Sequence, residues 1–209
     1  MKRKNIILLG KGSLTIKIAE WFKDNCNLVA VIPDIPEPDW SDSLVNWCNS
    51  NDVKVIESGN YEDLEENITI DLAMSVFYGK IIKKPFIERC QSIINLHNSP
   101  LPKYRGVRPI NWALKNKEKK HGVSIHKITE GIDDGDILGQ ITYPIYAEIE
   151  EVEDVYNKSL VYGWLLFKDV ISNFDYAIKN SSKQHENFSY YSKKQIHLLG
   201  DRSEFRRIP

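Results

Sequence analysis

Short apolar runs alternate with helical patterns through the first 97 residues of the chain. The runs are rich in Val, Ile and Leu and end at glycine, proline or polar residues, as buried parallel strands do. They span Asn5–Leu9, Leu28–Ile32, Val53–Ile56, Leu72–Phe77 and Ile93–Leu96. Between them, helices are predicted to begin at Ser13 and at Ser41 or Asp42, with a short one around Pro85–Cys90. This alternation predicts βαβ units, with a parallel sheet and helices on both of its faces.

The pattern changes after a helix predicted over Pro109–Asn116. Gly122–Ile128 and Ile137–Ile145 alternate like two strands joined by a turn, which predicts an antiparallel hairpin at the sheet edge. A long helix is predicted from about Val152 to Ile178. The expected fold class is therefore α/β, a Rossmann-like and mostly parallel sheet flanked by helices, with an antiparallel edge hairpin and a long C-terminal helix. One main domain is expected over residues 1–180, and a tail or small extension over residues 181–209.

Composition narrows the function classes. Of the 209 residues, 42% are hydrophobic and 27% are charged, which is ordinary for a soluble globular protein, and the formal net charge is −1. The missing basic excess disfavours nucleic-acid partners. Cys26, Cys48 and Cys90 form no CxxC pair and are odd in number, so free thiols are expected rather than disulfides or a metal site. The basic start precedes an apolar run too short for a signal peptide, and no stretch reaches the length of a membrane span, which predicts a cytoplasmic protein.

Gly10-Lys11-Gly12-Ser13 follows a predicted strand and opens a predicted helix. Backbone N–H groups and the positive end of the helix dipole can hold a phosphate at such a place. Thr15 stands where the dinucleotide fingerprint has its third glycine, and no Gly-Lys-Ser/Thr closes a phosphate loop. A tight strand-to-helix turn and a contact with part of a substrate are equally open interpretations.

The strongest chemical signal begins at the last predicted strand of the parallel sheet. Asn95 and His97 alternate with apolar residues, so their side chains share one face at the strand's carboxyl end, where α/β sheets bind ligands. An Asn amide can stabilise a developing oxyanion, and a His can move a proton near neutral pH. We interpret the other histidines, His121, His126, His185 and His197, as structural.

A second signal is the acidic segment Gly131–Ile137, which has three carboxylates and two glycines. A solvated hairpin turn explains this composition equally well, and the spacing does not match a calcium loop.

Taken together, these segments resemble the 10-formyltetrahydrofolate-dependent formyltransferases. The resemblance rests on Asn-x-His, Ser-x-Leu-Pro-x-Tyr-Arg-Gly, Gly-Val-Ser-Ile-His and Ile-Asp-x-Gly-Asp-Ile-Leu, in that order between Asp71 and Gln140. It implies an enzyme that moves a formyl group from N10-formyltetrahydrofolate, as co-substrate, to an amine without a metal. The family's catalytic Asn, His and Asp match Asn95, His97 and Asp133.

The resemblance also implies where the ligands bind. The folate is expected to contact Tyr78, Gly79, Lys80, Ile81, Ile82, Glu130, Gly131 and Asp136. The acceptor substrate is expected to contact Lys11, Ser13, Ser99, Lys103 and Arg105. Asn98 departs from the proline or glycine that the family commonly has there, which bears on the acceptor pocket.

The acceptor is read from weaker signals. Gly106–Leu114 looks like the sugar and methionyl-tRNA branches of the family, and Tyr190–Lys194 looks like the sugar enzymes, so a nucleotide-linked amino sugar is expected. Glycinamide ribonucleotide transformylase is the alternative by length. Methionyl-tRNA is less favoured, because little chain follows the long helix and the net charge is near zero. A formyltetrahydrofolate hydrolase and a non-catalytic folate-binding module also stay open, and the aromatic tail suggests a homodimer.

Overall fold

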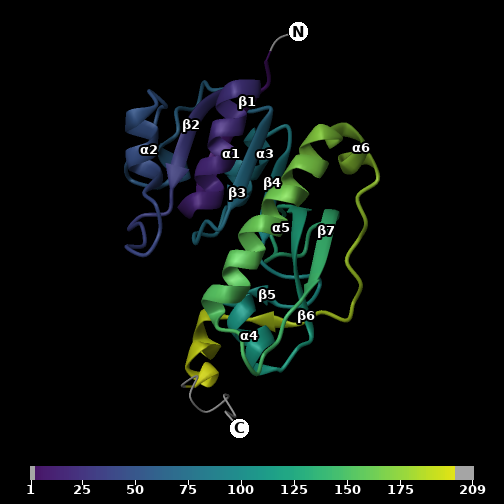
Figure 1. The fold of residues 1–209 in the computed structure, drawn as a ribbon. Coiled ribbons are helices and arrows are strands. Elements are labelled where there is room, and N and C mark those ends of the chain that lie inside the picture. The colour runs from purple at the N-terminus through teal and green to yellow at the C-terminus, as the bar shows by residue number, and fades with distance from the viewer. Residues whose placement is uncertain (1–2, 201–209) are drawn as a thin grey trace. The chain divides into compact units, whose positions relative to one another are not determined.

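The computed structural model describes residues 3–200, which form two compact units (Figure 1). Unit 1 comprises residues 3–96 and 127–130, and unit 2 comprises residues 97–126 and 131–200. The expected boundary at residue 180 falls inside unit 2 and stays a prediction. Residues 201–209 of the expected extension lie outside the described residues.

Unit 1 is built on parallel strands in the order β2-β1-β3-β4. The strands are β1 (Asn5–Gly10), β2 (Asn27–Pro33), β3 (Leu72–Val76) and β4 (Ile93–His97), of which the last residue, His97, belongs to unit 2. Ile7 and Leu9 of β1 are fully buried in a core with Ala30 and Ile32 of β2. The strands read as nearly continuous apolar runs because a parallel sheet is covered on both faces.

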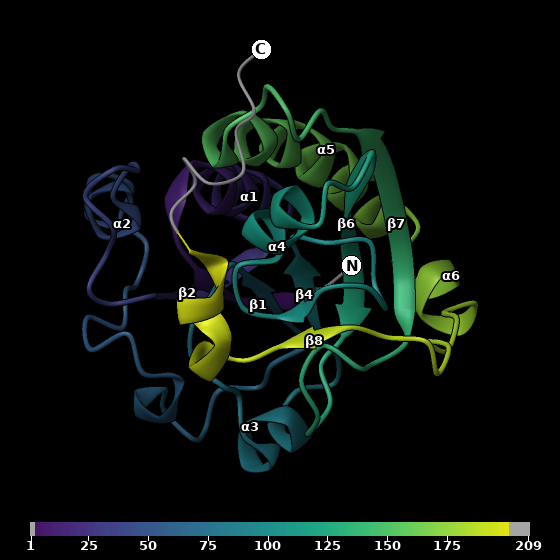
Figure 2. The same cartoon turned by 90° about the horizontal axis from the view of Figure 1, so that it is seen from below.

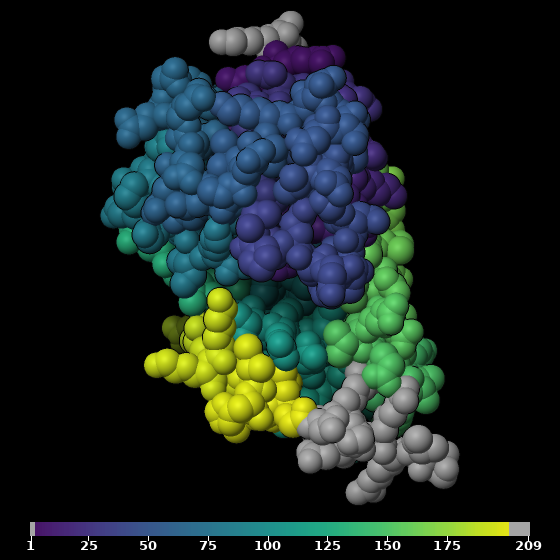
Figure 3. Space-filling view, turned by 90° about the vertical axis from the view of Figure 1, so that its left-hand side faces the viewer, coloured from purple at the N-terminus to yellow at the C-terminus, as the bar shows by residue number. Residues whose placement is uncertain are grey.

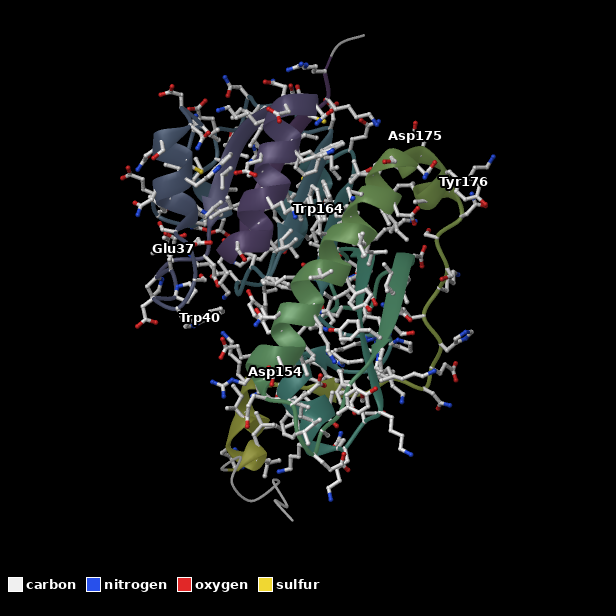
Figure 4. The ribbon with its side chains drawn as sticks, in the orientation of Figure 1. Glu37, Trp40, Asp154, Trp164, Asp175 and Tyr176 are labelled. Carbon is white, nitrogen blue, oxygen red and sulfur yellow. The ribbon has the colours of Figure 1, made fainter. Side chains whose placement is uncertain are left out.

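The helices of unit 1 are α1 (Gly12–Asn25), α2 (Leu44–Ser50), α3 (Lys84–Arg89) and the short 3-10 helix η1 (Tyr61–Asp63). The expected helix starts are wrong by a few residues. Lys11 caps α1, and Ser43 caps α2 by accepting a hydrogen bond from the Asn46 backbone N–H at 3.1 Å. The carboxylate of Glu37, which is labelled in Figure 4, also accepts a hydrogen bond from the Leu44 backbone N–H at 2.6 Å. Such a carboxylate satisfies amides that a helix leaves unpaired at its start.

The strand predicted over Val53–Ile56 is wrong. That stretch makes only an isolated bridge between Val31 and Val55. The chain turns away immediately afterwards, where the Gly59 backbone N–H donates to Ile56 O at 2.9 Å and Gly59 adopts a positive φ of 60°. The apolar residues of this stretch are therefore only half-buried, and they form one bridge instead of a strand.

Unit 2 contains an antiparallel hairpin of β6 (Lys120–Lys127), of which the last residue, Lys127, belongs to unit 1, and β7 (Ile137–Pro144), with Val123 opposite Ile141. Its helices are α4 (Pro109–Lys115), α5 (Val152–Ser172), α6 (Phe174–Lys179) and the 3-10 helix η2 (Lys193–Leu199). Helix α5 packs closely on β7, since a Cβ at Gly139 would lie 2.8 Å from Val170 Cγ2. Two short strands, β5 (Arg105–Gly106) and β8 (Tyr190–Tyr191), pair in parallel.

The long helix predicted over Val152–Ile178 is two helices, because the chain leaves helical geometry at Asn173. The Asn173 side chain donates to Asp169 O at 3.2 Å, the kind of local bond by which Asn competes with a continuing helix. Figure 4 shows Asp154 in the first turn of α5, and Asp175 and Tyr176 on α6.

The predicted fold class is confirmed as α/β, with mostly parallel strands, flanking helices, an antiparallel hairpin and a long helix late in the chain. The three cysteines are free thiols, as expected. Within residues 3–200, no helix is both long enough and apolar enough to cross a membrane.

Candidate active site

The His97 side chain is fixed through one of its two ring nitrogens. His97 ends β4, and its residue is only 7% exposed. Its Nε2 lies 2.9 Å from the backbone oxygen of Tyr104. A carbonyl oxygen can only accept, so Nε2 carries the hydrogen and Nδ1 is the nitrogen that gains or loses a proton. The backbone at Tyr104 thereby selects the tautomer and orients the ring.

Asp133 lies between two histidines. One carboxylate oxygen, Oδ2, is 3.6 Å from His97 Nδ1, and the other, Oδ1, is 3.5 Å from His126 Nε2. The backbone N–H of Gly106 donates to Oδ2 at 2.8 Å. Burial alone would raise the pKa of Asp133, but the two rings and this N–H outweigh it and hold the pKa well below the ordinary range for Asp. Asp133 is therefore ionised at neutral pH.

The geometry makes Nδ1 of His97 the nitrogen that can act on a ligand. A separation of 3.6 Å is too long for a direct hydrogen bond, although the charged carboxylate lies close enough to attract a positive charge on the ring. Of the two neighbouring aspartates, it is Asp133 that approaches His97, while Asp134 is exposed. The structure thus brings His97 and Asp133 together, as the resemblance implies.

His126 is a site residue that the sequence interpretation missed. The sequence alone indicates a structural histidine, yet the 2% exposed side chain of His126 contacts the Asp133 carboxylate. Its ring meets that of His97 edge to face, with centroids 6.2 Å apart. The available signal is the pair of polar residues Ser124 and His126, which lie two positions apart and alternate with apolar residues along the strand.

Asn95 belongs to unit 1 and lies two residues before His97 on β4. Within unit 1, Asn95 is half-buried and pairs with Ser75 of β3.

The expected acceptor contacts of unit 2 are engaged within the unit. The buried Ser99 donates through its hydroxyl to Lys103 O at 2.7 Å, and Lys103 Nζ lies 3.3 Å from Glu118 Oε1. Arg105 donates from Nε and Nη2 to Gln184 Oε1 at 3.0 and 2.8 Å. These bonds give the three residues structural roles in the turn after β4, and their contact with a substrate stays a prediction.

In unit 1, the expected folate residues Tyr78–Ile82 follow directly after β3. Tyr78 and Lys80 both donate to Gly59 O at 2.7 Å, and Ile82 is buried in the core. Ile81 between them is 69% exposed. The segment therefore has an apolar exposed tip on anchored flanks, which suits contact with a planar ligand.

The remaining expected ligand residues have local partners where the structure shows them. In unit 1, Lys11 forms an ion pair with Asp34, Ser13 is half-buried in the first turn of α1, and Glu130 Oε1 lies 3.0 Å from Lys84 Nζ. In unit 2, Ser181 Oγ lies 3.5 Å from Asp136 Oδ2, and Gly131 is exposed. Their contacts with a ligand stay predictions. Among residues 3–200, no group of three or more His, Cys, Asp or Glu side chains is arranged to hold a metal ion.

Comparison with known proteins shows which family the chain matches. The family described as formyl transferase matches residues 41–170. A methionyl-tRNA formyltransferase of Fervidobacterium nodosum is 38% identical over 136 residues, which cover 64% of this chain but only 43% of that protein.

Two solved structures resemble most of the chain. An N-formyltransferase from Helicobacter canadensis, in complex with folinic acid and dTDP-3-aminofucose, has a TM-score of 0.79 at 30% identity and covers 94% of this chain and 72% of its own. WlaRD, a sugar 3N-formyl transferase in the presence of dTDP and 5-N-formyl-tetrahydrofolate, has a TM-score of 0.80 at 29% identity over 96% of this chain and 74% of its own. Because the family match spans more than half of the sequence, the chain belongs to the formyl transferase family.

Proposed function

We propose that the protein transfers the formyl group of N10-formyltetrahydrofolate to the exocyclic amine of a nucleotide-linked amino sugar. The observation that carries this proposal is the buried His97–Asp133 pair at the carboxyl end of β4, in a chain of the formyl transferase family. The sugar acceptor is supported by the two solved structures above, which resemble 94% and 96% of the chain.

The reaction begins when the acceptor amine attacks the formyl carbon of the folate. A tetrahedral oxyanion forms, and hydrogen-bond donors aimed at its position lower the barrier. The imidazolium of His97 supplies one donor from Nδ1, because Nε2 is held by Tyr104 O. The Asn95 amide on the same strand face supplies the second donor.

The proton of the attacking amine must then leave. The carboxylate of Asp133 is ionised beside His97 Nδ1, so it stabilises the imidazolium and orients a water molecule that relays the amine proton. Collapse of the intermediate breaks the bond between the formyl carbon and N10 of the folate, and N10 receives the proton. The products are the formamido sugar and tetrahydrofolate.

Methionyl-tRNA is the second candidate acceptor, because the curated relative that acts on it is 38% identical. The chain spans less than half of that relative's length, and its net charge of −1 gives no general attraction for a polyanion.

An acceptor panel tests the proposal. The purified protein is incubated with N10-formyltetrahydrofolate and dTDP-3-aminofucose, glycinamide ribonucleotide, methionyl-tRNA or no amine, and tetrahydrofolate release is measured. We expect release that depends on the amino-sugar nucleotide. Release only with one of the other two amines would overturn the acceptor. Release without any amine would identify a hydrolase, and folinic acid binding without any release would identify a binding module.

A further inference from the structure

A C-terminal segment, residues 182–191, connects two loops that lie far apart in the sequence of unit 2. At one end Ser182 bridges Ile137 at the start of β7, with mutual backbone bonds of 2.8 and 2.9 Å. At the other end β8 pairs with β5, and the Arg105 backbone N–H donates to Ser189 O at 2.9 Å. Figure 2 shows this segment in yellow, running from α6 past β7 to β8. In the space-filling view of Figure 3, yellow C-terminal residues form part of the surface of unit 2.

Gln184 occupies the middle of this segment and joins both loops through its side chain. Its Nε2 donates to the backbone oxygens of Asp133 and Gly135, both at 2.8 Å. Its Oε1 accepts from Nε and Nη2 of Arg105. Both amide hydrogens and both oxygen lone pairs are therefore used, a full set for a glutamine.

These bonds close a ring around Asp133. From the Asp133 backbone oxygen the ring runs through the Gln184 amide to the Arg105 guanidinium, and along the chain to Gly106. From there the Gly106 N–H returns to Asp133 Oδ2 at 2.8 Å. Asp133 has a positive φ of 51°, which a non-glycine residue holds only when its surroundings impose it. The ring thus constrains the backbone and the carboxylate of Asp133 at once.

We propose that Gln184 is a positioning residue of the formyl transfer site, and that it acts by holding the Asp133 carboxylate beside His97. Phe188 contributes from the same segment, because the Arg105 guanidinium lies over its ring at 4.5 Å to the centroid. The inference rests on the proposed function, in which Asp133 works with His97.

Two variants separate the halves of the Gln184 side chain. Gln184→Ala removes every bond, whereas Gln184→Glu keeps an acceptor for Arg105 but loses both donors to the Asp133 loop. We expect each to lower kcat with dTDP-3-aminofucose by about 10- to 100-fold, with a much smaller change in KM, because misplacing a working group by about 1 Å costs rates of this order. The matched control is Gln91→Ala, which removes an exposed glutamine of unit 1 and should leave kcat unchanged.

A double-mutant cycle distinguishes the possible failures. If Gln184 acts through Asp133, Gln184→Ala should have little further effect in an Asp133→Asn background. The inference would be overturned if Gln184→Ala lowered kcat in the Asp133→Asn background by the same factor as in the wild type. It would also be overturned if the single variant Gln184→Ala kept the wild-type kcat. Full activity of Asp133→Asn alone would instead overturn the proposed function. In a separate measurement free of any acceptor, the Gly106 amide, which donates to Asp133 Oδ2, should exchange its hydrogen faster in Gln184→Ala than in the wild type, because the loosened loop releases the carboxylate. An unchanged exchange rate would contradict the positioning role.

Discussion

At the scale of single residues, each carboxylate oxygen of Asp133 has its own partner. The carboxylate faces His97 with one oxygen and His126 with the other. Because the Gly106 N–H also binds it, the carboxylate stays charged despite its burial. A buried carboxylate held in this way suits the stabilisation of a neighbouring imidazolium.

We predict that Asn95→Ala, His97→Asn and Asp133→Asn each reduce formyl transfer by roughly 10²- to 10³-fold, the usual cost of losing one donor to an oxyanion or its support. Steady-state release of tetrahydrofolate measures the loss, and circular dichroism checks that each variant is folded. Near-wild-type turnover of the folded His97→Asn protein would show the mechanism to be wrong.

His121 gives the molecule a dependence on pH that is separate from catalysis. Its ring is fully buried, and its Nε2 pairs with Asn98 O at 2.9 Å. Burial lowers the pKa of His121 from 6.5 to about 4. Between these two values the unfolded chain binds a proton that the folded protein does not, so stability falls as the pH drops. The effect is absent above pH 6.5 and complete below pH 4.

We therefore expect the wild type to lose about 2 kcal/mol more unfolding free energy than His121→Gln when the pH changes from about 7 to 5. Urea titrations at the two pH values measure this difference. His185→Gln, at an exposed histidine, is the control and should keep the wild-type slope. Equal slopes in wild type and His121→Gln would contradict the assignment.

The sequence predicts the site unevenly at this scale. Asn95 and His97 follow from strand alternation, while Asp133 follows only from the family resemblance, because an acidic turn has the same composition. His126 was misread because a histidine on a buried strand is usually structural. Gln184 carries no sequence signal at all, since its partners Asp133 and Arg105 are distant along the chain and only folding brings them together.

At the scale of elements, the two-residue pair of β5 and β8 depends on a glycine. Gly106 has a positive φ of 91°, and a Cβ there would lie 2.2 Å from Tyr191 O. Tyr191 itself stacks between Tyr104 and Trp112, with centroids 5.8 and 4.2 Å away. Because the backbone of Gly106 approaches that of Tyr191 closely, the Tyr191 ring can stack on Tyr104 and Trp112 and hold the turn after β4.

Gly106→Ala should therefore detach β8 from β5 and cost on the order of 3 kcal/mol of unfolding free energy, because the strained φ and the clash add. Hydrogen exchange of the Val107 amide, which donates to Tyr191 O at 2.9 Å, reports the detachment. Asn187→Ala, an exposed change on the same segment, should keep that amide protected. Unchanged protection in Gly106→Ala would show that the pair does not depend on the glycine.

Most elements were predicted from their periodic pattern, and the two-residue strands were not. The apolar runs of β1 to β4 and the alternation of β6 and β7 gave their positions to within a few residues. β5 and β8 are too short to show any period, and Asn173 interrupts α5 and α6 without disturbing the apolar pattern. In each case tertiary contacts decide what the local pattern leaves open.

At the scale of the whole molecule, the fold class and the family follow from the sequence, while the acceptor does not. The residues expected to carry the formyl transfer chemistry lie in a dense motif, so pattern and resemblance agree. The expected acceptor contacts lie in turns whose side chains, such as Lys103 and Arg105, already have partners within unit 2. The sequence relative and the structural neighbours accordingly name different acceptors, and the acceptor panel decides between them.

The hydrogen bonds of Gln184 also have a consequence for the order in which the protein folds during synthesis. Asp133 and Arg105 are made well before residue 184, and ribosomes add about 5–20 residues per second. The Asp133 carboxylate therefore exists for a time on the order of seconds before the Gln184 side chain that completes its surroundings is made. A nascent chain can fold its parallel sheet during this interval, but it gains an ordered Asp133 only when the later segment arrives.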